Sequence, residues 1–173
     1  MNAQCKVHAA VMLISGFSLA GHCFAAFQAK RVSVLEDIML MLSVIETRLG
    51  YDCPPVTDIM KILSENPSLS RLEFLKSCFE RVCAGEPFPS AWRESVKNQQ
   101  ELCRLLAGSA EQLCVLGEEL GATDLEAQLR KCEYYKKVFS AELELQKEKS
   151  QKYSKLFPPL GFMLGICAAI III

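Results

Sequence analysis

The sequence has 173 residues, of which 51% are hydrophobic, and its formal net charge is −1. This length allows one compact domain with some chain left over. Nucleic-acid-binding domains are usually strongly basic, so a charge near zero argues against nucleic acid as a partner.

The chain is poorly supplied with catalytic groups. Its two histidines, His8 and His22, both lie in an apolar N-terminal stretch, so neither is available as a base in the rest of the sequence. There is also no phosphate-binding loop, no dinucleotide-binding glycine pattern and no His-Glu-x-x-His zinc motif. We therefore predict a protein that is not an enzyme and that needs no cofactor and no small-molecule substrate.

Nine cysteines are scattered along the chain, and none of them forms a Cys-x-x-Cys pair. Zinc ligands usually come in close pairs, so the spacing predicts no metal site. Cys78, Cys103, Cys114 and Cys132 stand among apolar neighbours, where cysteine packs as a small hydrophobe. We expect these four to be reduced core residues in a reducing compartment.

Residues 7–27 carry no Asp, Glu, Lys or Arg and have about the length of a membrane-spanning helix, roughly 20 residues. A secretory signal peptide is the alternative, but its apolar core is normally shorter, about 7–15 residues. We favour a retained transmembrane helix after a short extracytoplasmic segment, residues 1–6. Gly16 and Ala20 lie one helical turn apart and would let another helix approach closely.

Residues 156–173 form a second uncharged stretch, which predicts a C-terminal transmembrane helix. Pro158 and Pro159 are expected in its first turn, where the backbone N–H groups have no helical partner. Gly161 and Gly165 give this helix a close-packing pair of its own, so we expect the two spans to pack on each other or on a partner.

The positive-inside rule orients these two helices. The only basic residue on the outer side is Lys6, whereas six lie on the inner side: Lys30, Arg31, Lys147, Lys149, Lys152 and Lys155. We therefore predict that residues 28–155 form a cytoplasmic domain and that both termini lie outside, in agreement with the reduced cysteines.

Residues 28–155 show helical periodicity throughout and predict six helices. The first covers 34–49, with its apolar face on Leu35, Ile38, Met39, Leu42, Ile45 and Leu49. Gly50, Asn66-Pro67 and Gly85 end successive helices, while Ser70-x-x-Glu73, Ser90 and Ser109-x-x-Gln112 are expected to start them. Trp92 is expected to anchor the core.

The most distinctive stretch is a corner between the fifth and sixth predicted helices. Gly121 is suited to end a helix in the left-handed conformation, and Thr123-x-x-Glu126 reads as a capping box for the next helix. Asp124 then falls in the first turn, where the helix dipole favours a carboxylate. Gly117 has no side chain, so another group can pack closely against the backbone of the helix that leads into this corner. A well-formed corner in a helical bundle, without any binding role, is the alternative interpretation.

The whole chain resembles the stage III sporulation protein AB family of endospore-forming bacteria. The residues that carry the resemblance are Ser90-Ala91-Trp92, Leu116-Gly117-x-x-Leu120-Gly121-x-x-Asp124-x-x-x-Gln128, the lysine-rich segment 147–155, and Leu160-Gly161-x-x-x-Gly165. The resemblance implies a six-helix antiparallel bundle similar to the cytoplasmic F domain of the type II secretion inner-membrane platform.

The same resemblance implies a function. The protein would sit in the outer forespore membrane, with its helical domain facing the mother-cell cytoplasm, and help to build the channel between mother cell and forespore. Its partners would be a secretion-type ATPase and ring-forming channel proteins, and a homo-oligomer is compatible with this assembly. Gly117, Gly121, Asp124 and Gln128 would form the docking corner or hold its shape.

Two other interpretations remain at this point. A membrane-tethered helical adaptor outside any secretion machine would need only the same architecture. An integral-membrane enzyme is disfavoured because the sequence lacks the chemistry described above.

Overall fold

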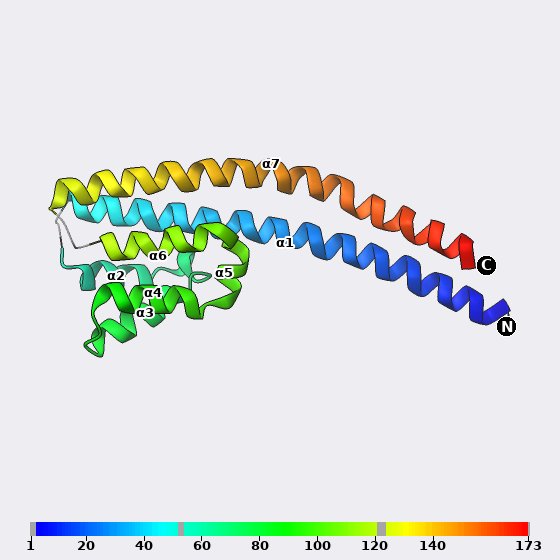
Figure 1. Cartoon of the computed structure of the whole chain (residues 1–173), viewed down its shortest axis with the longest axis horizontal. Coiled ribbons are helices and arrows are strands. Elements are labelled where there is room, and N and C mark those ends of the chain that lie inside the picture. The colour runs from blue at the N-terminus through cyan, green and yellow to red at the C-terminus, as the bar shows by residue number, and fades with distance from the viewer. Residues whose placement is uncertain (1–2, 52–53, 121–123, 173) are drawn as a thin grey trace. The chain divides into compact units, whose positions relative to one another are not determined.

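The structure, a computed structural model, describes residues 3–51, 54–120 and 124–172, apart from the side chains of 3–10, 13, 14, 158, 161, 165, 168, 169, 171 and 172. Every regular element in these ranges is helical (Figure 1), which confirms the predicted all-α class. In order they are α1 (Ala3–Tyr51), α2 (Val56–Ser64), the 3-10 helix η1 (Pro67–Leu69), α3 (Phe74–Cys83), α4 (Phe88–Asn98), α5 (Gln100–Leu106), the 3-10 helix η2 (Ala107–Ser109), α6 (Ala110–Glu119) and α7 (Leu125–Ile172).

The chain divides into two compact units, which we call the terminal unit (residues 1–32 and 144–173) and the central unit (residues 33–143). Their charges have opposite signs. The terminal unit contains seven basic and two acidic residues, a net charge of +5, and the central unit contains twelve basic and eighteen acidic residues, a net charge of −6. The overall charge of −1 is therefore the sum of a strongly basic unit and a strongly acidic one.

Two of the predicted helix boundaries do not exist. Residues 7–27 and 34–49 were expected as separate helices, but both belong to α1, because residues 28–33 contain neither Gly nor Pro and the helix continues through them. Pro158 and Pro159 were expected in the first turn of a helix, yet they lie deep inside α7. Each removes one backbone donor from the interior of that helix.

Two of the predicted helix ends are confirmed, at Asn66-Pro67 after α2 and at Gly85 after α3, whereas Gly50 lies inside α1. Of the predicted starts, Ser109 is confirmed because it occupies the N-cap position of α6, although its side chain makes no capping hydrogen bond. The other two predicted starts are wrong. Gly85 follows α3 with a φ of +93°, the left-handed conformation that glycine adopts without a Cβ penalty. The side chain of Asn66 accepts a hydrogen bond from the Ser68 backbone at 3.0 Å, in the turn that follows α2. Ser90, expected to precede the fourth helix, lies inside α4, which begins at Phe88.

The start of α3 is made by a residue from another part of the chain. The predicted capping box at Ser70 is wrong, since α3 begins at Phe74 and no side chain of its own segment caps it. Instead, the side-chain oxygen of Gln99 accepts a hydrogen bond from the Phe74 backbone at 3.0 Å, and its amide group donates to the Arg71 carbonyl at 2.9 Å. Gln99 also separates α4 from α5.

Trp92 is fully buried in the central unit, as predicted. Its helix, α4, packs against α3 and α6, and the Phe74 ring meets the Trp92 ring edge-on with centroids 5.1 Å apart. The predicted apolar face of 34–49 is buried except for Met39, which is half-buried. Fully buried aromatic rings of this size dominate the energetics of a core.

No helix in the part of the chain that the structure describes is both long and apolar enough to cross a membrane. The predicted spans, 7–27 and 156–173, include residues outside the described side chains.

Candidate functional site

Gly117 is in contact with the protein's own core. A Cβ atom placed on Gly117 would overlap the indole ring of Trp92. The Trp92 Nε1–H donates a hydrogen bond to the Leu113 carbonyl, one turn earlier in α6, at 2.8 Å. The ring therefore lies flush against the α6 backbone, and only glycine leaves room for it. The close packing predicted at Gly117 is an internal contact between α4 and α6.

The rest of the corner is described in part. Gly121 and Thr123, with the predicted helix end and capping box, lie outside the described residues. Asp124 directly precedes α7, and its carbonyl accepts the hydrogen bond from the Gln128 N–H at 3.0 Å. Asp124 therefore occupies the N-cap position and not the first turn. Its side chain is exposed, whereas Gln128 is half-buried.

Arg93 adds an ion-pair network on the same α4–α6 contact. It donates to Glu118 and, at 3.1 Å, to Glu111, so that one guanidinium joins two carboxylates of α6. The hydrogen bond from Arg93 lowers the pKa of Glu118 and raises the pKa of Arg93 itself. The sequence analysis missed this network, although Glu111 and Glu118 are seven residues apart and therefore share one face of a helix.

A second network joins α6 to α7. The Tyr135 hydroxyl donates to Glu119 at 3.2 Å, and Lys131 forms an ion pair with the same carboxylate at 3.4 Å. Burial, with the nearby negative charge of Glu119, raises the pKa of Tyr135 to about 12. The tyrosine therefore stays a neutral donor over the physiological range. Both sides of α6 are thus tied by polar contacts to neighbouring helices.

The buried thiols are expected to be unreactive. Cys78, Cys114 and Cys132 are buried as predicted, whereas Cys103 is only half-buried. Burial raises the pKa of Cys78 to about 12 and that of Cys132 to about 11. A thiol must ionise before it acts as a nucleophile or metal ligand, so these groups serve as packing.

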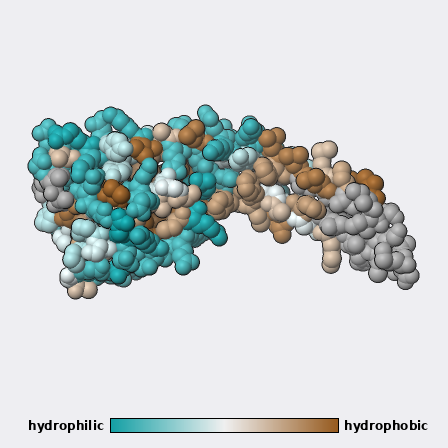
Figure 2. Space-filling view, in the orientation of Figure 1, coloured by the Kyte–Doolittle hydropathy of each residue, from teal (hydrophilic) through white to brown (hydrophobic). Residues whose placement is uncertain are grey.

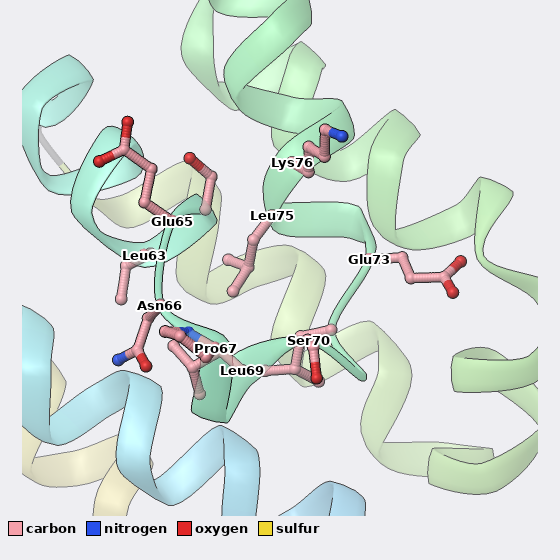
Figure 3. A pocket seen from close by; sticks show the side chains of 11 residues that line it. Leu63, Glu65, Asn66, Pro67, Leu69, Ser70, Glu73, Leu75 and Lys76 are labelled. Atoms are coloured by element: carbon pink, nitrogen blue, oxygen red, sulfur yellow. The ribbon is translucent and has the colours of Figure 1, made fainter.

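A cleft of about 480 Å³ lies between α2, η1 and the start of α3 (Figure 3). Leucine side chains line it, including Leu63, Leu69 and Leu75, and the carboxylates of Glu65 and Glu73 point away from it (Figure 3). The labelled acids do not converge on a common point. The lining therefore mixes leucines with polar side chains, among them Asn66, Ser70 and Lys76.

In the terminal unit, α1 and α7 meet through aromatic and amide contacts. The rings of Phe24, Tyr153 and Phe157 contact one another, with Phe24 and Phe157 stacked at 4.5 Å between centroids. Further along, the buried Gln146 side chain donates to the buried Gln28 side chain at 2.5 Å. A buried amide pair of this kind fixes which residues face each other, because shifting either helix would leave polar groups unpaired.

The predicted small-residue pairs of the terminal unit are only partly visible. Among the residues that the structure describes, none has an atom near the position of a Cβ added to Gly16, so none of them packs closely on it. Ala20 lines a groove of about 360 Å³ that α1 and α7 form together. The side-chain positions of Gly161 and Gly165 lie outside the described set.

Beyond the aromatic contacts, the terminal unit exposes its large apolar side chains. Met12 is 75% exposed, Met163 62% and Leu164 56%. Figure 2 shows brown, hydrophobic side chains gathered over this unit and mostly teal, hydrophilic ones over the central unit. Monomeric soluble proteins rarely expose apolar patches this continuous, which usually mark a membrane or protein interaction site.

These features define a class: an all-helical protein with a central unit packed around one tryptophan and a terminal unit whose apolar side chains face outward. The sequence matches the family model of stage III sporulation protein AB over residues 6–173, nearly the whole chain. The protein therefore belongs to that family, and its role lies in sporulation. A comparison with curated proteins and one with solved structures gave no match.

Proposed function

We propose that the protein is a membrane-anchored, non-enzymatic platform component of the channel between mother cell and forespore. Membership of the stage III sporulation protein AB family across residues 6–173 is the observation that carries this proposal. The finer assignment, a cytoplasmic domain like the F domain of the type II secretion platform, rests on the resemblance of the sequence to that family.

Two observations support a membrane anchor, which the family resemblance would place in the outer forespore membrane. The terminal unit exposes large apolar side chains that a bilayer would cover. Its basic residues, apart from Lys6, lie on the side of the apolar stretches that continues into the central unit, as expected for a cytoplasmic flank. In this proposal the central unit faces the mother-cell cytoplasm, where its buried thiols stay reduced.

The central unit is the part we assign to partner contacts. It would receive the conformational change of a secretion-type ATPase and pass it to ring-forming channel proteins. Gly117 is covered by Trp92 and therefore shapes the corner, whereas the exposed Asp124 is a group that a partner could reach. The net charge of −6 on this unit favours a partner surface of positive charge.

Affinity purification of the full-length protein in mild detergent, from cells midway through sporulation, tests the proposal. We expect a secretion-type ATPase and other forespore-channel proteins to be recovered with it. Recovery of the protein alone, under conditions that keep other membrane complexes intact, would contradict the platform and favour the simple tether.

A substitution separates contact from stability at the corner. Asp124→Ala should lower the free energy of unfolding by only about 0.5–1 kcal/mol, through the helix dipole and the N-cap. Asp58→Ala is the matched control, because Asp58 is an exposed aspartate in the first turn of α2. We expect Asp124→Ala, at normal abundance, to impair sporulation and Asp58→Ala not to. Normal sporulation in the Asp124 variant would remove Asp124 from the functional site.

A further inference from the structure

We infer that the terminal unit binds one anionic phospholipid, with an acyl chain in the groove between α1 and α7 and the phosphate near the lysines at one end of it. This inference rests on the membrane anchor proposed above and names the lipid class that the anchor selects. Three features of the unit carry it. They are an apolar groove, a cluster of three aromatic side chains at one end of that groove, and basic residues beyond this cluster.

The groove is apolar. Its volume is about 360 Å³, and its lining contains no charged side chain: Phe17, Ala20, Gly21, Phe24, Phe157, Leu160 and Leu164. The small residues Ala20 and Gly21 deepen the α1 side of the groove. Such a lining suits a hydrocarbon chain, which needs apolar walls and no hydrogen-bond partners.

One end of the groove is marked by the aromatic contacts. Phe24 and Phe157 line the groove, and Tyr153 contacts both rings from the polar side. Tyrosine is enriched where a membrane meets water, because its ring is apolar and its hydroxyl is not. The Phe24–Tyr153–Phe157 cluster therefore fixes the depth at which hydrocarbon gives way to headgroups.

Exposed lysines follow at the right height. Along α7, Lys155, Lys152 and Lys149 precede Phe157 by two, five and eight residues, or about 3, 7.5 and 12 Å of helix rise. The headgroup layer of a bilayer leaflet is about 5–8 Å thick. A lysine side chain can extend along the helix toward a phosphate, so all three ammonium groups reach the height of this layer. At about 100° per residue, Lys149 lies on the same face of α7 as Leu160, which lines the groove, whereas Lys155 lies on the opposite face from Phe157.

Charge complementarity favours a lipid over a second copy of the chain. A parallel neighbour would bring six basic and two acidic residues, a net charge of +4 without Lys6, to the same end of the groove, and like charges repel. An anionic phospholipid matches both the groove and the lysines, because it has an apolar chain for the groove and a net negative headgroup for the lysines. A zwitterionic lipid matches the groove, but its headgroup has no net negative charge for the lysines.

Native mass spectrometry of the full-length protein in detergent tests the inference, with phosphatidylglycerol and phosphatidylcholine as probes. We expect one phosphatidylglycerol to be retained in preference to phosphatidylcholine. Lys149→Gln should weaken retention of phosphatidylglycerol about fivefold, Lys155→Gln should weaken it less, and Lys149→Gln, Lys152→Gln and Lys155→Gln together should abolish the preference. The matched control replaces the exposed Lys61, Lys76 and Lys97 of the central unit and should leave the preference unchanged.

A second pair of variants tests the groove. Ala20→Phe should fill it and weaken retention of both lipids, whereas Leu19→Phe, at an exposed neighbour that does not line the groove, should not. Circular dichroism of both variants confirms that the helices are intact. Unchanged lipid retention in Ala20→Phe would overturn the assignment of the groove.

Other outcomes separate this inference from the anchor itself. Equal retention of the two lipids by a protein that still floats with vesicles would overturn the lipid preference and leave the anchor standing. A dimer that Ala20→Phe dissociates would show that a second copy fills the groove. Failure to float with vesicles of either lipid would contradict the membrane anchor as well.

Discussion

The terminal and central units use apolar residues in opposite ways, although α1 and α7 contribute to both. The central unit buries Phe74, Trp92 and Phe139 almost completely, whereas the terminal unit leaves Met163 and Leu164 more than half exposed. The first has a net charge of −6 and the second +5. The two units are therefore not distinguished by their helix content. They are distinguished by where their apolar and charged side chains lie. A covered core indicates a folded domain, and an uncovered apolar surface indicates a medium or partner that covers it.

The largest effect is expected from a substitution that interrupts the apolar surface of the terminal unit. Leu164→Lys places a charge among exposed apolar side chains and should disfavour membrane insertion by about 2.5–3.5 kcal/mol. The fraction of the protein that remains with membranes after a carbonate wash measures this. Leu125→Lys, at an exposed leucine of the central unit, is the control and should stay with the membranes. Equal loss in both variants would contradict the division of roles.

The next effect is confined to the core of the central unit. Gly117→Ala forces a methyl group against the Trp92 ring, and overpacking of this kind costs about 1–3 kcal/mol. Denaturant unfolding followed by circular dichroism measures the loss. Gly108→Ala is the matched control, because nothing lies near an added Cβ at Gly108. A Gly117 variant as stable as the wild type would show that α6 can move away from α4 without cost.

A smaller effect concerns the shared cap. Gln99→Ala removes both hydrogen bonds that hold the start of α3 and should lower the free energy of unfolding by about 1–2 kcal/mol. Gln100→Ala, at the neighbouring exposed glutamine, should have little effect. Thermal unfolding of the two variants provides the comparison. Equal melting temperatures would mean that water replaces the Gln99 contacts fully.

The smallest effect depends on pH. The pKa of Glu118 is lowered in the folded state, first of all by its hydrogen bond with Arg93, so the folded state binds the proton of this group less tightly than the unfolded state does. The stabilisation is therefore present above the ordinary glutamate pKa of about 4.5 and is lost as the pH falls below it. Glu118→Gln should flatten this part of the stability profile. Both side chains are partly exposed to solvent, which screens their interaction, so the change should be slight.

Local signals predicted the fold where they act within one segment. Gly85 ends α3 because only its own φ matters there, and the apolar face of 34–49 is buried because helical spacing alone places it. The absence of a helix break at residues 28–33 could also have been read from the lack of Gly and Pro. Burial of Trp92 followed from its size.

Contacts between distant segments could not be predicted in this way. Gln99 caps α3 from 25 residues away, and no pattern near Phe74 reveals it. Asp37 is buried on the apolar face of α1, where Arg71 meets it with two hydrogen bonds at 2.6 and 2.8 Å. The sequence predicted a close approach at Gly117, but Trp92 as its partner depends on how α4 and α6 pack. Of the predicted corner, the Asp124–Gln128 backbone bond is described, and Gly121 and Thr123 lie outside the described residues.

The burial of Trp92 gives the central unit an intrinsic optical signal. It is the single tryptophan of the chain, and its indole lies between α4 and α6 with its N–H on the Leu113 carbonyl. Its fluorescence should therefore emit at short wavelength and report on the packing around this ring, without tryptophan emission from the terminal unit. A partner that separates α6 from α4 would expose the ring to water and shift the emission to the red. Conformational coupling through the central unit can thus be followed in unlabelled, full-length protein.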